Sequence, residues 1–213
     1  MTVSARLLGV GDILDLRAYE RARDDYRRQI IELKRRRRIA LGPVLTIVFE
    51  CADTVRFQVQ EMARAERIAT DEGVQQELDV YNRLLPEAGE LSATLFVELT
   101  TEADLRRWLP RLVGIERALA FELGDPVDVV VPSAPEATHA EALTRENVTA
   151  AVHYVRFAFP SRARARFSGG DVAALVVRHP EYEARAVLSP EVRAELAGDL
   201  EGRSELIPLA RLD

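Results

Sequence analysis

Two segments contain many hydrogen-bonding side chains interspersed with apolar ones: residues 49–68, FECADTVRFQVQEMARAERI, and residues 76–86, QELDVYNRLLP. Carboxylates, amides and guanidinium groups alternate there with valine, phenylalanine, methionine and leucine. This density indicates either a buried polar network or a ligand site, because buried polar groups need partners. The candidate ligand-binding residues are Gln58, Glu61, Arg64, Glu66, Tyr81, Asn82 and, from a later segment, His179.

Glu66 is the most informative carboxylate of this set. On the expected helix it falls near Val59 and Met62, on or beside the apolar face, where an ionised carboxylate needs a partner such as Arg64. We favour a structural Gln–Glu–Arg network, in which Glu66→Gln costs roughly 3–5 kcal/mol as for a broken buried ion pair. The alternative is a carboxylate-rich ligand or metal site, although such helical metal sites carry histidine three residues after glutamate and this segment has none.

A second candidate is a run of positive charge. Arginine forks in this run could hold a phosphate, a carboxylate cofactor or an acidic protein partner. Alternatively, the cations complete the C-terminal end of a helix, where the helix dipole favours them. Both interpretations are open at this point. The patch for an anion or a partner consists of Lys34, Arg35, Arg36, Arg37 and Arg38, and Lys34 is the only lysine of the chain.

Histidine and cysteine limit the metal chemistry. The spacing of His139, His153 and His179 matches no metal-ligand pattern; His179, at the end of a predicted strand, could face a cleft, but a structural role is favoured for it and for His153. Cys51 is the only cysteine, so one chain cannot build a zinc or iron–sulfur site on several thiolates. We expect Cys51 to be a small buried hydrophobe.

Other function classes are disfavoured by missing patterns and by charge. The chain has no G-x-S-x-G, P-loop or Rossmann glycine pattern, so common hydrolase, P-loop and dinucleotide chemistries are not expected. A net charge of −6 disfavours nucleic-acid binding, and the basic run lacks interleaved aromatic residues. No apolar run is long enough for a membrane span and no secretory signal is visible, so we expect a cytoplasmic protein.

Hydrophobic periodicity predicts an α+β fold, with a mainly antiparallel sheet packed with four to five helices. The helices are expected at residues 15–37, 53–68, 71–85, 101–112 and 189–200. The strands are expected at residues 39–41, 44–49, 91–99, 118–123, 127–131, 149–159, 172–178 and 183–188, with 162–167 as a further possibility. We expect a single domain over residues 1–213, with a possible loop or sub-domain boundary at 132–147.

Four segments resemble a bacterial family known as domain of unknown function 3501. They are LKRRRRIALGP at residues 33–43, the 49–68 segment, ELDVYNRLLP, and RHPEY at residues 178–182. The resemblance implies no catalytic residue. It implies an accessory role near rubrerythrin-like or iron–sulfur redox proteins, which is an association and not a mechanism.

The favoured function is therefore a cytoplasmic, non-catalytic accessory protein that binds a redox-linked protein partner through the polar segment and the basic run. An Arg36→Glu, Arg37→Glu variant is expected to lose that partner. The alternative is an enzyme, or a protein that binds a small ligand or metal, using residues 58–82. Catalytic residues, cofactor and metal content are left open.

Overall fold

The computed structural model describes residues 7–136, 148–203 and 206–209. Its strands form two antiparallel sheets, which confirms the antiparallel pairing but replaces the one expected sheet with two. Sheet A has the order β1-β2-β3-β7-β6, from Arg38–Leu41, Leu45–Phe49, Glu90–Val97, Val152–Ala158 and Ala134–Pro135. Sheet B has the order β5-β4-β8-β9, from Val129–Pro132, Leu119–Leu123, Ala173–His179 and Tyr182–Val187.

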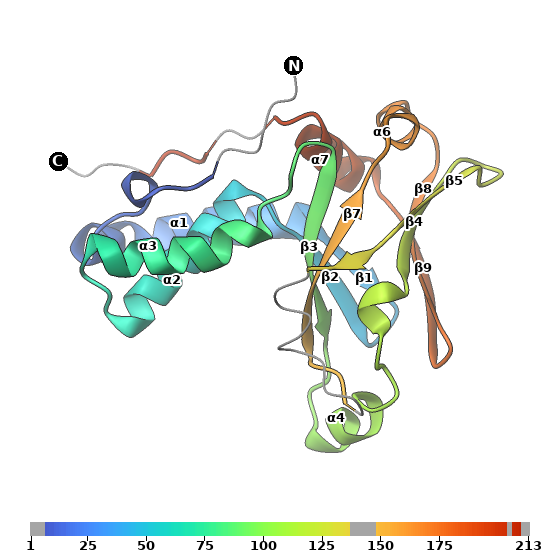
Figure 1. Ribbon diagram of the computed structural model, residues 1–213, viewed down its shortest axis with the longest axis horizontal. Helices are drawn as coiled ribbons and strands as arrows, with labels where there is room; N and C mark the ends of the chain where they lie inside the picture. Colours follow the sequence, from blue (N-terminus) through green and yellow to red (C-terminus); the bar gives the residue numbers. More distant parts are fainter. Residues whose placement is uncertain (1–6, 137–147, 204–205, 210–213) are drawn as a thin grey trace.

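The described residues form six α-helices, so the α+β class is confirmed with more than the expected four to five helices. They are α1 (Leu16–Arg36), α2 (Ala52–Glu66), α3 (Asp71–Tyr81), α4 (Glu102–Trp108), α6 (Ser161–Ser168) and α7 (Pro190–Leu200). Short 3-10 turns lie at Val10–Asp12, Asn82–Leu84 and Ile115–Arg117. Figure 1 shows α1, α2 and α3 projecting together to one side of the two sheets.

Helix α6 corrects the possible strand at residues 162–167. The sequence RARARF alternates as a strand does, but the buried residues are Ala163 and Phe167, which are four apart and lie on one helical face. The ring of Phe167 packs edge-on against Phe121 and Phe159, with ring centroids 5.7 and 5.4 Å apart. Burial of this one face, together with the helix propensity of alanine and arginine, explains the helix.

Helix α1 forms where the periodicity predicts it. The Asp15 carboxylate accepts hydrogen bonds from two backbone N–H groups of the first turn, and one stripe of the helix is buried. That stripe consists of Tyr19, Tyr26, Ile30 and Leu33. The helix ends immediately before β1, and this placement sets the direction of the last basic side chains.

The two faces of sheet A differ in what they contact. The inner face packs on sheet B through three buried rings, in which Phe121 lies 5.8 Å from Phe49 and 4.9 Å from Phe157 between centroids. Side chains on a strand alternate between faces, so Ser92, Thr94 and Phe96 of β3 lie on the outer face. The strand register then places Val48, Thr94 and Tyr154 in one row across that face.

The expected boundary at residues 132–147 lies mostly outside the described residues. Of this segment, the structure describes the end of β5, the short strand β6, and Glu136, whose N–H donates to the Tyr154 carbonyl at 2.9 Å. The single-domain organisation stays a prediction. The core between the sheets, which draws buried residues from both, supports it.

Candidate functional site: a pocket on the outer face of sheet A

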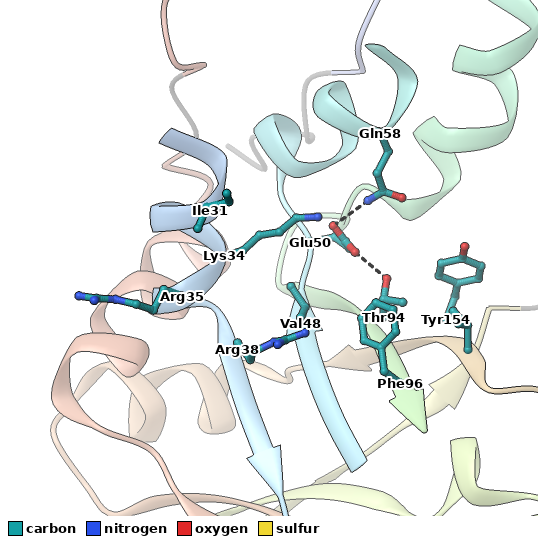
Figure 2. A pocket seen from close by; sticks show the side chains of 11 residues that line it. Ile31, Lys34, Arg35, Arg38, Val48, Glu50, Gln58, Thr94, Phe96 and Tyr154 are labelled. Carbon is teal, nitrogen blue, oxygen red and sulfur yellow. Dashed lines mark hydrogen bonds between the residues drawn. The ribbon is translucent and has the colours of Figure 1, made fainter. Parts of the chain in front are cut away.

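A pocket with a volume of about 690 Å³ opens where helices α1 and α2 meet the outer face of sheet A. Its lining residues come from α1 and α2, from strands β1, β2, β3 and β7, and from Glu50 just after β2. Figure 2 shows Lys34, Gln58 and Thr94 directed toward Glu50. The residues that give it chemical character are Lys34, Glu50, Gln58, Thr94, Phe96 and Tyr154. This size suits a small organic molecule, because ligand pockets commonly span about 300–1,000 Å³.

Glu50 is the buried charge of the pocket, with 3% of the residue exposed. It follows β2 directly, and its backbone N–H donates to the Ser92 carbonyl at 2.8 Å, which fixes its side chain on the outer face. Its Oε2 accepts from Thr54 Oγ1 at 2.5 Å and from Gln58 Nε2 at 3.2 Å. Its Oε1 accepts from Thr94 Oγ1 at 2.5 Å. The hydroxyl distances are those of charge-assisted hydrogen bonds to a carboxylate.

The walls of the pocket are largely apolar. Val48, Phe96 and Val152 present hydrocarbon surface from three neighbouring strands. Tyr154 adds an aromatic ring in the same row as Thr94. Burial, and then the negative charge of Glu50, raise the pKa of the Tyr154 hydroxyl, so this phenol is neutral at physiological pH.

Three cations of the basic run border the pocket. The Lys34 ammonium lies 5.7 Å from the centroid of the Phe57 ring, and Figure 2 shows it directed toward Glu50. The arginines are paired on the surface instead. Arg35 lies 3.1 Å from a Glu32 carboxylate oxygen, and Arg38 lies 3.2 Å from Glu98. The anion-binding interpretation of these three residues stays a prediction.

The other two arginines of the run point away from the pocket and toward α7. Arg37 is buried, and its guanidinium donates to the carbonyls of Phe49 at 2.9 Å and Glu50 at 3.1 Å. It also forms ion pairs with Glu195 and Asp199. Arg36 lies 3.3 Å from Glu195. These contacts join the end of α1 to α7, so an Arg36→Glu, Arg37→Glu variant tests folding before it tests partner binding.

The predicted residues Glu61 and Arg64 belong to contacts between α1 and α2. The Glu61 carboxylate accepts from Tyr19 Oη at 2.6 Å and from Arg23 Nε and Nη2, both at 2.7 Å. The hydrogen bonds from Arg23 are the main cause that lowers the pKa of Glu61. Arg64 pairs with Glu20 at 2.6 Å. These contacts join α1 to α2 in two separate pairs, and neither contains the glutamine of the expected Gln–Glu–Arg network.

The prediction for Glu66 was wrong in its premise. Glu66 lies at the exposed end of α2, so it is not a carboxylate on a buried face. The helix turns the buried side chains Val59 and Ala63 inward while position 66 faces solvent. An exposed carboxylate needs no buried counter-charge. The large cost expected for Glu66→Gln therefore has no structural basis.

Tyr81, Asn82 and His179 do not reach the pocket. Asn82 donates to the Leu8 carbonyl at 2.9 Å and accepts from the Leu8 N–H at 3.0 Å, and Tyr81 packs partly buried on the same cluster. His179 Nε2 donates to the Val113 carbonyl at 3.0 Å while its Nδ1 accepts from the Glu181 N–H at 3.2 Å. Of the predicted ligand-binding residues, only Gln58 lines the pocket.

Two residues expected to be structural are buried as predicted. His153 is 3% exposed, and its Nε2 lies 2.8 Å from Thr149 Oγ1 and 3.0 Å from the Ala150 carbonyl oxygen. Desolvation lowers its pKa. Cys51 is buried at the start of α2, and this burial raises the pKa of its thiol. Neither residue lines the pocket.

Sequence reasoning missed Glu50 and Thr94 as site residues. A signal existed for Glu50, because it is a carboxylate that directly follows the wholly buried strand Leu45–Phe49. A weaker signal existed for Thr94, which alternates with Leu91, Ala93 and Leu95 on a strongly apolar strand. Neither signal reveals that α1 and α2 come together over these side chains.

Two other kinds of feature are absent from the described ranges. No group of three or more histidine, cysteine, aspartate or glutamate side chains has a metal-binding arrangement there. No helix in the same ranges combines the length and apolar character of a transmembrane span.

Comparison with known proteins identifies relatives of the whole fold. A crystal structure of a protein of unknown function from Burkholderia pseudomallei is 34% identical in sequence, covers 92% of this chain and 100% of its own, and has a TM-score of 0.83. No curated protein sequence matches the chain. A family model described as "Protein of unknown function (DUF3501)" matches residues 8–200. The chain therefore belongs to the DUF3501 family.

Proposed function

We propose that this protein binds a small organic molecule in the pocket on the outer face of sheet A. The carrying observation is the buried Glu50 carboxylate, which three uncharged donors hold at the base of a pocket of about 690 Å³. A convergent polar group inside a largely apolar concavity is the usual arrangement of a ligand site. This proposal keeps the ligand-binding alternative and moves it from residues 58–82 to a site centred on Glu50.

A ligand site also gives a reason for a buried carboxylate that has hydrogen bonds but no ion pair among the described residues. Thr54, Gln58 and Thr94 contribute hydrogen bonds but no positive charge. A buried charge without an ion pair lowers stability relative to a neutral group of the same shape. Groups held at a cost to folding are typical of functional sites.

A ligand screen with a pocket-filling variant tests the proposal. Metabolite mixtures are screened by thermal shift and by NMR, first on wild type and then on Val152→Trp, whose indole would occupy the pocket beside Phe96. Val130→Trp is the matched control, because Val130 is an exposed valine on sheet B. We expect hits that Val152→Trp loses and Val130→Trp keeps. Hits that survive in both variants, or no hits at all, would contradict the proposal.

Partner binding is the second candidate function, favoured by one exposed apolar side chain. Ile31 of α1 is 57% exposed at the rim of the pocket, one helical turn before Arg35. Large apolar groups beside arginine are frequent at protein interfaces. We propose that this rim contacts a protein partner in the cytoplasm, and the redox-linked, rubrerythrin-like or iron–sulfur partner implied by the family resemblance is the first to test.

A pull-down tests this second candidate without disturbing the buried Arg37. The variant is Ile31→Asp, Arg35→Glu, and the control is Val80→Asp, Arg106→Glu, which changes an exposed valine of α3 and an exposed arginine of α4 that do not line the pocket. A redox protein recovered stoichiometrically with wild type and with the control, but not with the rim variant, is the expected result. Equal recovery with both variants would contradict the assignment of the rim.

A further inference from the structure

The Glu50 carboxylate has room for one more donor. A carboxylate accepts about four hydrogen bonds, and its three donors occupy two positions on Oε2 and one on Oε1. In the described part of the chain, no cationic nitrogen lies within the 4.0 Å ion-pair limit of these oxygens. The remaining position on Oε1 therefore suits a donor from outside the chain, and a cationic donor gains the most because the carboxylate is desolvated.

The positive charge around the pocket does not reverse this preference. Arg35 and Arg38 each lie within ion-pair distance of a surface glutamate, Glu32 and Glu98 respectively. The two arginines at the mouth of the pocket are thus ion-paired, whereas within the described residues only neutral groups donate to the Glu50 carboxylate. Electrostatic complementarity at the base favours a positively charged ligand group.

Lys34 shows which kind of group this region accommodates. It is the only lysine among the chain's 29 basic residues, its Nζ lies 5.7 Å from the Phe57 ring centroid, and Figure 2 shows its side chain directed toward Glu50. A lysine side chain is a primary ammonium on a flexible hydrocarbon chain, which a planar arginine fork does not imitate. Because the Lys34 ammonium stops short of an ion pair, a ligand ammonium can take the position on Glu50 without breaking one.

We propose, on the basis of the ligand-binding function above, that the pocket recognises an amphipathic primary amine. Its ammonium donates to Glu50 Oε1, and its hydrocarbon or aromatic body lies along Val48, Phe96 and Val152. Lys34 is the internal competitor for the same carboxylate. The apolar walls select the body, and Glu50 selects the head group.

Three probes with one body and different head groups test this inference: 3-phenylpropylamine, 3-phenylpropan-1-ol and 3-phenylpropanoate. Binding to wild type is measured by calorimetry and by NMR shifts. We expect the amine to bind about tenfold more tightly than the alcohol, equivalent to about 1.4 kcal/mol, and the carboxylate to bind most weakly. Glu50→Gln should bring the amine down to the affinity of the alcohol.

A second variant tests the inference even if Glu50→Gln does not fold. Lys34→Met retains the stem but removes the competing ammonium, so amine affinity should rise several-fold, about 3–10 times, while alcohol affinity stays unchanged. Arg28→Met, an exposed change elsewhere on α1, should alter neither affinity.

The outcomes separate this inference from the proposed function. Binding of the alcohol that Val152→Trp abolishes, with no preference for the amine, would overturn the amine assignment and leave the ligand pocket intact. Tightest binding of the carboxylate would overturn it in favour of an anion site at Lys34. If none of the probes binds and the metabolite screen is also empty, both the amine assignment and the pocket function fail.

Discussion

Arg37, just before β1, and Glu50, just after β2, are both buried charged residues. Their side chains nevertheless have different kinds of partner. Arg37 is surrounded by opposite charge and by carbonyl oxygens, with Glu195, Asp199 and two backbone acceptors on its guanidinium. Among the described residues, the Glu50 carboxylate accepts hydrogen bonds only from neutral donors, and Glu50 lines a pocket. The difference shows that burial alone does not distinguish a structural charge from a functional one. The nature of the partners does.

The largest expected effect is on the structural side of this comparison. Arg37→Met should lower the free energy of unfolding by roughly 3–5 kcal/mol, because Glu195 and Asp199 lose their buried cation. Urea unfolding measures the loss. Arg36→Met is the control: its side chain is 35% exposed, so about 0–1 kcal/mol is expected. A similar small effect for Arg37→Met would show that Arg37 is not a structural charge.

A smaller effect is expected at Glu61, where charge is also matched but burial is partial. Glu61→Gln should cost about 1–2 kcal/mol at neutral pH, since it weakens the hydrogen bonds from Tyr19 and Arg23. Urea unfolding at pH 7 measures it. Arg64→Met, which removes the more exposed pair with Glu20, should cost less than 1 kcal/mol.

The Glu61 carboxylate should also make the free energy of unfolding depend on pH in the acid range. Its pKa in the folded protein lies below the ordinary value of 4.5, mainly because of the hydrogen bonds from Arg23. The resulting stability is complete above pH 4.5 and is lost as the pH falls through the folded-state pKa. Wild type should therefore lose more stability than Glu61→Gln between pH 5 and pH 3 in chemical unfolding. Parallel pH profiles for the two proteins would contradict this assignment.

The smallest effect is expected at Glu66. Because this side chain is exposed, Glu66→Gln should change the free energy of unfolding by less than about 0.5 kcal/mol. It also removes a negative charge that raises the pKa of Glu77, for which burial is the larger cause. A loss of several kcal/mol in urea would restore the buried-network interpretation of Glu66.

Local periodicity predicted most of the elements. The stripe at Tyr19, Tyr26, Ile30 and Leu33 predicted α1, and the apolar alternation around Leu95 predicted β3. It was misleading at residues 162–167, where RARARF fits both a two-residue and a four-residue spacing. Only contact with the Phe121 and Phe159 rings decides in favour of the helix.

The site was predicted only in part because it depends on contacts between distant segments. Gln58 was correctly placed among polar side chains on α2, but its partner Glu50 lies outside that helix, and Thr94 comes from a strand 44 residues after Glu50. Contacts with distant segments also decide the surroundings of each residue in the basic run. Lys34 and Arg37 lie only three residues apart, but Lys34 lines the pocket and Arg37 pairs with α7, because α1 ends between them.

The unfolding free energy of Glu50→Gln, measured in urea beside wild type, tests the central comparison most directly. Glutamine keeps the shape and can still bond to Thr54, Gln58 and Thr94, but it removes a buried charge that forms no ion pair within the described residues. We expect stability equal to that of wild type within about 1 kcal/mol, or higher, as for a group held for binding and not for folding. A loss of about 3 kcal/mol or more would show that Glu50, like Arg37, is a structural charge, and would contradict the account.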